Sequence, residues 1–197
     1  THLNPIILAS ASSARIKMLS AVEIPFSTDP AHLDEAGIRS SMQGVGGAET
    51  ALALAQRKAE IISEQNPNSL VIGADQILEF DGALFGKPET LLAARDQLAT
   101  LRGHTHQLLT GACVILNGDV LWRHSNKAHL TMRGFSDEFL ETYLEQAGDA
   151  LWSPGAYHLE GSGATLFINV DGDYFSILGL PLLPLLDFLR TQGVMQA

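Results

Sequence analysis

Segments with the hydrophobic pattern of strands and segments with the pattern of helices follow one another along this chain without strict alternation. Pro5 to Ala9 and Leu70 to Gly73 are short apolar runs typical of buried strands. Between them, Ala48 to Glu64 carries apolar residues at helical spacing. Further on, Asn117-Gly118-Asp119 separates two apolar runs and is typical of a hairpin turn. We therefore predict an α/β fold with a mixed, curved central sheet and flanking helices, rather than a doubly wound parallel sheet.

The remaining elements follow from the same kinds of pattern. Further helices are expected after the serine-rich turn up to Leu19, from Leu91 to Leu101, from Ser136 to near Gly148 and from about Pro181, and further strands over Leu108 to Leu116, Val120 to Trp122, Lys127 to Arg133 and Thr165 to Val170. We see no internal repeat and no linker. A length of 197 residues suits one core, so we expect a single domain over residues 1–197.

Composition and charge narrow the classes of partner. Apolar residues make up 46% of the chain and charged residues 17%, which is typical of a compact globular protein. The formal net charge of −10 disfavours duplex nucleic acid, because that binding depends on clustered Lys and Arg. A small polyanion is compatible with this charge, since a few well-placed cations, a helix N-terminus and a divalent ion can outweigh it.

The sequence shows no sign of a membrane segment or an export signal. Thr1 to Leu8 lacks a basic region followed by a long apolar run. The most apolar stretch, Leu178 to Leu189, is interrupted by two prolines and by Asp187. The single cysteine, Cys113, lies inside an apolar run and cannot form an internal disulfide. We therefore expect a cytoplasmic protein that does not enter the membrane.

Two acidic positions are candidates for chemistry. Asp75 directly follows the apolar run Leu70 to Ala74, and the carboxyl ends of strands border the binding crevice in open α/β folds. The alternative is an aspartate that only caps a turn. Glu35, in the pair Asp34-Glu35, lies in an expected loop, where acidic pairs are commonly solvated. If Asp75 and Glu35 converge, they supply oxygen ligands suited to Mg²⁺ or Mn²⁺.

A candidate anion site follows the first strand. The backbone N–H groups of Ser10 to Arg15 and the positive end of the next helix would face the crevice, with Arg15 in the first turn. A cation at a helix N-terminus opposes the helix dipole, which favours a functional role for Arg15. Lys58 interrupts a helix of small residues, and Lys87 lies between a glycine and a proline. For both lysines the alternative is solvation at the surface.

Other common kinds of site lack support. The histidines His104, His106, His124 and His129 match no common zinc spacing and have no set of cysteine partners. Gly161-Ser162-Gly163 lacks the Lys-Ser/Thr that ends a P-loop and the third glycine of a dinucleotide fingerprint, so a turn is the better interpretation. No nucleophile-elbow motif supports Ser-His-Asp catalysis.

Several segments taken together resemble the Maf family, over Ile6 to about Leu189. They are, in order, LASASSARIKML, HLDE, LALAQRKA, VIGADQ, FGKPET, LRGHTHQLLTG, FSDEFLETYL, GAYHLEGSG and GDYFSILGLPL. The resemblance implies a two-lobed α/β fold of the Maf/ITPase-like kind around a deep cleft, usually as a homodimer. It also implies hydrolysis of a nucleoside triphosphate to the monophosphate and pyrophosphate with a divalent metal cation, Mg²⁺ or Mn²⁺.

The same resemblance assigns roles to the candidate residues. Asp75 matches the catalytic acidic residue and Glu35 the second acidic residue, and the two would hold the metal. The cations expected to take part in catalysis on the phosphate side are Arg15, Lys58 and Lys87. The residues expected to bind substrate are Ser10, Ser12, Arg15, Gln76 and Glu160.

Two features of the sequence bear on the choice of nucleotide. Many family members read Ser-Pro-Arg-Arg where this chain has Ser12-Ser13-Ala14-Arg15, so one of two arginines is absent. Loss of a charged hydrogen bond is typically worth ~1.5–3 kcal/mol, which indicates weaker activity or another nucleotide. Gln76 and Glu160 resemble the 7-methyl-GTP branch, whereas the pyrimidine branch reads Ala-Asp-Thr and later carries Gln. We predict a modified purine such as 7-methyl-GTP as substrate, with dTTP or UTP as the alternative.

Two other functions stay open on the sequence. Family members are linked to septum formation, so a weakly active or non-catalytic nucleotide-binding regulator of cell division is one alternative. The other is a phosphatase that removes phosphates singly and releases orthophosphate. Retention of Asp75, Glu35, Lys58 and Lys87 favours catalysis, because binding alone requires no centre of carboxylates and metal.

Overall fold

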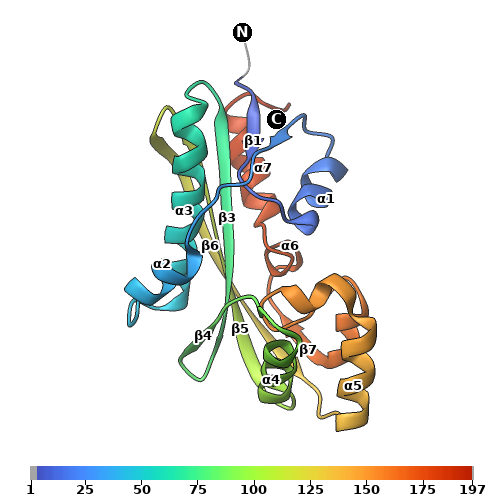
Figure 1. The fold of residues 1–197 in the computed structure, drawn as a ribbon. Coiled ribbons are helices and arrows are strands. Elements are labelled where there is room, and N and C mark those ends of the chain that lie inside the picture. The colour runs from blue at the N-terminus through green and yellow to red at the C-terminus, as the bar shows by residue number, and fades with distance from the viewer. Residues whose placement is uncertain (1–3, 197) are drawn as a thin grey trace.

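Within residues 4–196, which the computed structural model describes, one seven-stranded sheet runs the length of the molecule (Figure 1). The ends of the domain expected over 1–197 lie outside these described residues. The strand order is β2-β1-β3-β5-β6-β7, with β4 beside β3. The strands are β1 (Ile6–Leu8), β2 (Ser27–Thr28), β3 (Leu70–Phe80), β4 (Ala83–Phe85), β5 (Thr105–Leu116), β6 (Asp119–Met132) and β7 (Phe167–Asp171). The pairs of β1 are parallel and the others antiparallel, which confirms the predicted mixed sheet.

Helices flank this sheet, as predicted. They are α1 (Ser13–Ala21), α2 (Glu35–Ser41), α3 (Gly47–Gln65), α4 (Leu91–Leu101), α5 (Asp137–Gln146), α6 (Tyr174–Ile177) and α7 (Leu182–Thr191), with 3₁₀ turns at Gly148–Trp152 and Ser162–Leu166. In Figure 1, α3 lies on one side of the upper half of the long strands, and α1 and α7 lie on the other. Two large hydrophobic clusters, one with α1 and α7 and one with α4 and α5, form the two lobes. No helix among residues 4–196 is both long enough and apolar enough to cross a bilayer.

Successive residues of β3 pack against different helices. Leu70 and Ile72 belong to the cluster with α1 and α7, whereas Val71 packs against α3. Since side chains alternate between the faces of a strand, Asp75 points to the side of α3 and Gln76 to the opposite side. Asp75 and Gln76 are neighbours in the sequence, but they therefore face different helices.

Two strands are longer than the sequence patterns predicted. β3 continues past Gly73 to Phe80, so Asp75 lies within a strand and not at its carboxyl end. β6 joins the separately predicted segments Val120 to Trp122 and Lys127 to Arg133. Both extensions pair along their length with β5, and this tertiary pairing overrides the weak strand propensity of their polar residues.

One edge of β3 is only partly covered by other strands. β1 pairs with residues 70–72, and β4 pairs with residues 78–80. Within the described chain, residues 73–77 have no strand partner on that edge. The carboxyl end of β1 opens onto this gap, so the crevice expected at a strand end is bordered by β1 rather than by the end of β3.

A buried hydrogen bond ties β5 to the segment that follows the first 3₁₀ turn. Nε2 of His106 lies 2.7 Å from the hydroxyl oxygen of Tyr157, and the two residues are 1% and 5% exposed. Burial lowers the pKa of His106 to about 4 and raises the pKa of Tyr157. Both side chains are therefore neutral in the folded protein at neutral pH.

Replacing His106 by Gln should make the protein less sensitive to acid. Because the folded-state pKa of about 4 lies below the ordinary value of 6.5, the unfolded state takes up the proton first as the pH falls. The contribution of His106 to stability is thus present above pH 6.5 and is lost towards pH 4, at about 1.4 kcal/mol per pH unit. Urea unfolding should show that the free energies of unfolding of wild type and His106→Gln differ less at pH 4 than at pH 6.5. Parallel pH dependences would contradict this assignment.

Candidate active site

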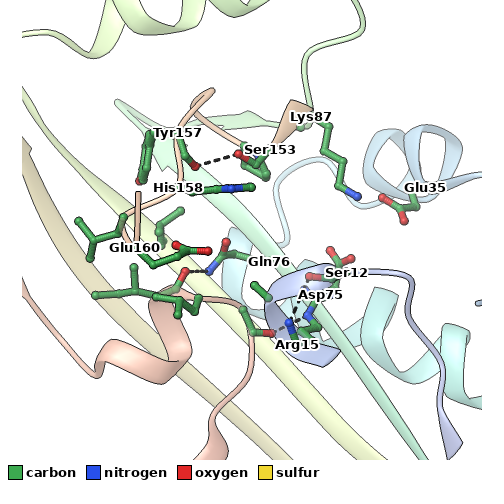
Figure 2. A pocket seen from close by; sticks show the side chains of 18 of the residues that line it. Ser12, Arg15, Glu35, Asp75, Gln76, Lys87, Ser153, Tyr157, His158 and Glu160 are labelled. Atoms are coloured by element: carbon green, nitrogen blue, oxygen red, sulfur yellow. Dashed lines mark hydrogen bonds between the residues drawn. The ribbon is translucent and has the colours of Figure 1, made fainter. Parts of the chain in front are cut away.

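A cavity lies at the open edge of β3, between the two lobes. Predicted residues among those that line it are Ser12, Arg15, Glu35, Lys58, Asp75, Gln76, Lys87 and Glu160. Figure 2 shows the side chains of Asp75, Gln76 and Glu160 around the same space, although they come from separate parts of the chain. Ser10 does not line the cavity. It is buried, and its hydroxyl oxygen accepts a hydrogen bond from Arg15.

The ammonium group of Lys58 joins the two acidic residues of the cavity. Its Nζ lies 2.5 Å from Oδ1 of Asp75 and 2.7 Å from Oε1 of Glu35. Lys58 is 8% exposed and Asp75 is 5% exposed, so neither charge is well solvated and each requires the other as a partner. The two carboxylates therefore converge on the same ammonium group. Such convergence is what a shared metal site would require.

Small residues let α3 lie close enough to the sheet for Lys58 to reach Asp75. A Cβ atom at Gly73 of β3 would lie 2.0 Å from the carbonyl oxygen of Ala55. At Gly111 of β5, a Cβ atom would lie 2.6 Å from backbone atoms of the same helix. Both distances are far below van der Waals contact, so only glycine allows this separation of helix and sheet.

Hydrogen bonds from two sides fix the guanidinium of Arg15. Its Nε donates to the carbonyl oxygen of Gly179 at 2.7 Å, and Nη1 donates to Oγ of Ser10 at 3.1 Å. Oγ of Ser12 caps α1 by accepting from the backbone N–H of Arg15 at 3.5 Å. Burial lowers the pKa of Arg15, while the carboxylates of the cavity act in the opposite direction. An arginine remains protonated under such conditions, so this cation is permanent.

Glu35 begins α2, whereas the sequence predicted a loop. Oδ1 of Asp34 accepts from the N–H of Gly37 at 2.9 Å and caps the helix. None of the residues of this short helix is buried, so it leaves no apolar stripe in the sequence. Burial alone would raise the pKa of Glu35, but Lys58 and two further cations outweigh it, and the pKa lies below its usual value. Glu35 is therefore ionised at neutral pH.

The amide of Gln76 is oriented by the segment at the end of α6. Its Nε2 donates to the carbonyl oxygens of Ser176 and Ile177 at 3.0 and 2.9 Å and lies 3.1 Å from Oγ1 of Thr110. These contacts occupy the amide nitrogen. Figure 2 shows the amide oxygen on the side of His158, within the cavity. Gln76 therefore offers a hydrogen-bond acceptor to a ligand.

The two ends of the cavity differ in chemistry. Glu35 and Lys87 lie at one end, and Glu160 lies at the other (Figure 2). Lys87 follows β4 and is exposed, and its charge contributes to the lowered pKa of Glu35. Glu160 is also exposed and lies near Gln76 and the ring of His158. Cations dominate the first end, whereas acceptor groups and a ring surround the second.

Comparison with known proteins places the chain in a family. The sequence matches the Maf-like protein family over residues 5–192. The chain belongs to the Maf family. A nucleoside triphosphate pyrophosphatase of Granulibacter bethesdensis is 50% identical over 188 residues, which cover 94% of this chain and 95% of the relative. One of Paramagnetospirillum magneticum is 47% identical over 190 residues, 95% of this chain and 98% of the relative. A 7-methyl-GTP pyrophosphatase of Brucella abortus is 44% identical over 190 residues, 95% and 96% of the two chains.

The donor set of this Maf cavity suits a divalent cation that shares its coordination with phosphate. Asp75 and Glu35 are the two carboxylates that contact Lys58, and residues 4–196 contain no cluster of three or more His, Cys, Asp or Glu that could hold a metal alone. Mg²⁺ is commonly bound by one or two carboxylates together with substrate phosphates and waters. The residues present fit such a cation, and a site built wholly from protein ligands does not fit.

Arg39 and His158 are among the lining residues of the cavity that the sequence did not predict. Arg39 of α2 lies one helical turn after Glu35, and its Nη1 is 3.5 Å from Oε2 of that residue. An acidic residue followed four positions later by a basic one is a helical signal, although the polar pair Asp34-Glu35 by itself predicts a loop. His158 also lines the cavity, two positions before Glu160. Its place in the segment that carries Glu160 is the signal that could have identified it.

Replacing Gly73 by Ala should destabilise the Maf fold at the contact of α3 with β3. The added Cβ would meet the carbonyl oxygen of Ala55 at 2.0 Å, so the helix must shift. Overpacking of this kind typically costs about 1–3 kcal/mol in free energy of unfolding. Gly134→Ala is the matched control, because a Cβ at Gly134 meets nothing within 4 Å. Equal stability of the two variants in urea unfolding would contradict the close approach.

Proposed function

We propose that this chain hydrolyses nucleoside triphosphates between the α and β phosphates and releases the monophosphate and pyrophosphate. The observation that carries the proposal is a single cavity with a cationic end and an acceptor-rich end. Its cations are Arg15, Arg39, Lys58 and Lys87. The names of the Granulibacter and Paramagnetospirillum relatives support the same reaction. The resemblance to the family also supports a homodimer in the cytoplasm.

The cations suit the charge that phosphoryl transfer develops. Arg15 and Lys87 face the space beside Asp75 and Glu35 (Figure 2). Negative charge spreads over the phosphate oxygens as the bond to the leaving group breaks, and fixed cations stabilise that charge without reorganising. Lys58 is already shared between two carboxylates, so its main contribution is to hold both of them in place.

Asp75 is the residue proposed to direct the attacking water. Lys58 engages Oδ1, which leaves Oδ2 to accept a hydrogen bond or a proton from water. The water oxygen attacks the α phosphorus, its proton passes to a base, and pyrophosphate leaves with the bonding electron pair. A divalent cation bound by Asp75 and Glu35 together with phosphate would polarise the phosphate oxygens. Asp75 can serve as the base, as a ligand or as both.

The acceptor-rich end favours a guanine-like base. Gln76 presents an amide oxygen, and a carboxylate such as that of Glu160 only accepts hydrogen bonds. Guanine offers two adjacent donors, N1–H and the N2 amine, whereas uracil and thymine offer one donor between two carbonyls. Methylation at N7 adds positive charge to the purine and strengthens N1–H as a donor. These features, with the name of the Brucella relative, support 7-methyl-GTP as the preferred substrate.

Product identity in the presence of Mg²⁺ tests the proposed reaction, with Asp75→Asn as the matched variant. The wild type should release pyrophosphate and monophosphate in equal amounts and lose activity in EDTA. Asp75→Asn should stay folded but turn over ~10²–10⁴-fold more slowly, because it removes a charge and a base while keeping the shape. Release of orthophosphate alone would identify a phosphatase. If no nucleotide is turned over, the protein only binds nucleotides. A folded Asp75→Asn with a near-normal rate would contradict the role of Asp75.

Replacing Glu160 by Gln should weaken the preference for guanine. The variant replaces an acceptor-only group with one that also donates, so the pairing with N1–H and the N2 amine is reduced. The measurement is kcat/KM for 7-methyl-GTP, GTP, dTTP and UTP with both proteins. The wild type should rank 7-methyl-GTP first, and the ranking should flatten in Glu160→Gln. A wild type that prefers dTTP or UTP, or a ranking untouched by the substitution, would refute this role.

A further inference from the structure

Arg39 is a cation of the cavity with little to hold it. It comes from α2, its side chain is 24% exposed, and it lines the cavity. Its contact with a carboxylate in residues 4–196 is the pair with Glu35 at 3.5 Å, at the outer limit for a hydrogen bond. A partly exposed pair of this length contributes little free energy. Most of the five N–H donors of this guanidinium are therefore available to a ligand.

The backbone at Gly86 leaves room for the guanidinium of Arg39. A Cβ atom at Gly86 would lie 3.0 Å from Nη2, 3.1 Å from Cζ and 3.4 Å from Nε of Arg39. All three atoms belong to the guanidinium group, so this group packs closely against the chain just before Lys87. The backbone of Gly86 is not in the left-handed conformation that favours glycine. A larger residue at position 86 would therefore be unfavourable because its side chain would crowd the guanidinium of Arg39.

The other cations of the cavity are differently engaged. Nζ of Lys58 is shared by two carboxylates at 2.5 and 2.7 Å, and Arg15 donates to the backbone of Gly179 and to Ser10. Arg39 lacks contacts of that quality within the described chain. A weakly paired arginine beside an exposed lysine is suited to an anion that arrives from solution, because a guanidinium can donate two parallel hydrogen bonds to one phosphate.

We propose that Arg39 binds the β and γ phosphates, which leave together as pyrophosphate. The inference rests on the proposed function and names the part of the substrate that this residue recognises. Arg39 pairs with Glu35 and packs at Gly86, and Figure 2 shows Glu35 and Lys87 at the end of the cavity remote from Glu160. If Glu160 takes the base, the far end takes the terminal phosphates. The incoming phosphate replaces the long contact with Glu35.

Equilibrium binding of the two products tests the assignment. Isothermal titration calorimetry with Mg²⁺ would compare wild type and Arg39→Gln with inorganic pyrophosphate and with GMP. The affinity of the variant for pyrophosphate should fall about ten-fold or more, which is the scale of one charged hydrogen bond, while the affinity for GMP stays as in the wild type. Arg57→Gln is the matched control, because Arg57 pairs with Glu60 on α3 at 3.2 Å and does not line the cavity. Unchanged binding of pyrophosphate by Arg39→Gln, or equal losses for both products, would overturn the assignment.

Gly86→Ala provides a second route to the same residue. The added Cβ presses on the guanidinium, so pyrophosphate should bind more weakly although every charge is retained. In the Arg39→Gln background the same glycine substitution should have little further effect, since its target is gone. A double-mutant cycle measures this coupling. Equal effects of Gly86→Ala in both backgrounds would show that it acts through Lys87 or the loop, and would count against Arg39.

The outcomes separate this inference from the proposed function. The protein could bind pyrophosphate tightly through Arg39 and yet release no pyrophosphate from any nucleotide. That result would support the binding site and reject the reaction. Release of pyrophosphate by a wild type whose affinity for pyrophosphate is unaffected by Arg39→Gln would retain the reaction and reject the site.

Discussion

The ammonium of Lys58, shared between Asp75 and Glu35, is the contact on which the rest of the cavity depends. It connects α3, β3 and α2, and it contacts two acidic groups at a place where Asp75 is nearly inaccessible to water. Removing the ammonium would leave both carboxylates without this partner, and loss of the partner of a buried charge typically costs about 3–5 kcal/mol. The glycine of β3 that admits α3 is part of the same arrangement, because the lysine reaches the acids only when the helix lies against the sheet.

A second set of contacts makes the cavity rigid from the opposite side. The carbonyl oxygens at the end of α6 and just after it accept from Gln76 and from Arg15. One segment of backbone thus orients a neutral acceptor near the end proposed for the base and a permanent cation near the end proposed for the phosphates. Groups that are already oriented before a ligand binds need not be ordered at the moment of reaction, which is the main advantage of electrostatic preorganisation.

The sequence predicted the mixed sheet and most of its elements because apolar periodicity and turn residues act locally. It also indicated Asp75, Arg15 and the two lysines, since each stands out against an apolar or small-residue background, and all of them line the cavity. The length of β3 and the helix that begins at Glu35 were missed for the opposite reason. The first depends on pairing with β5, and the second buries no residue of its own. Arg39 could not be predicted without that helix, because it reaches the cavity only by lying one helical turn after Glu35.

The hydrogen bond between Arg15 and Gly179 joins positions 164 residues apart. Polypeptides emerge from the ribosome with the N-terminal end first, and contacts between distant positions cannot form until the later partner has been made. During synthesis, Arg15 therefore lacks this backbone partner until the segment that carries Gly179 has been made. The cavity acquires its final shape only when the segment that carries Gly179 has left the exit tunnel. A chain cut short just before that segment would carry both acidic residues and all four cations, and would still lack the backbone that orients Arg15 and Gln76.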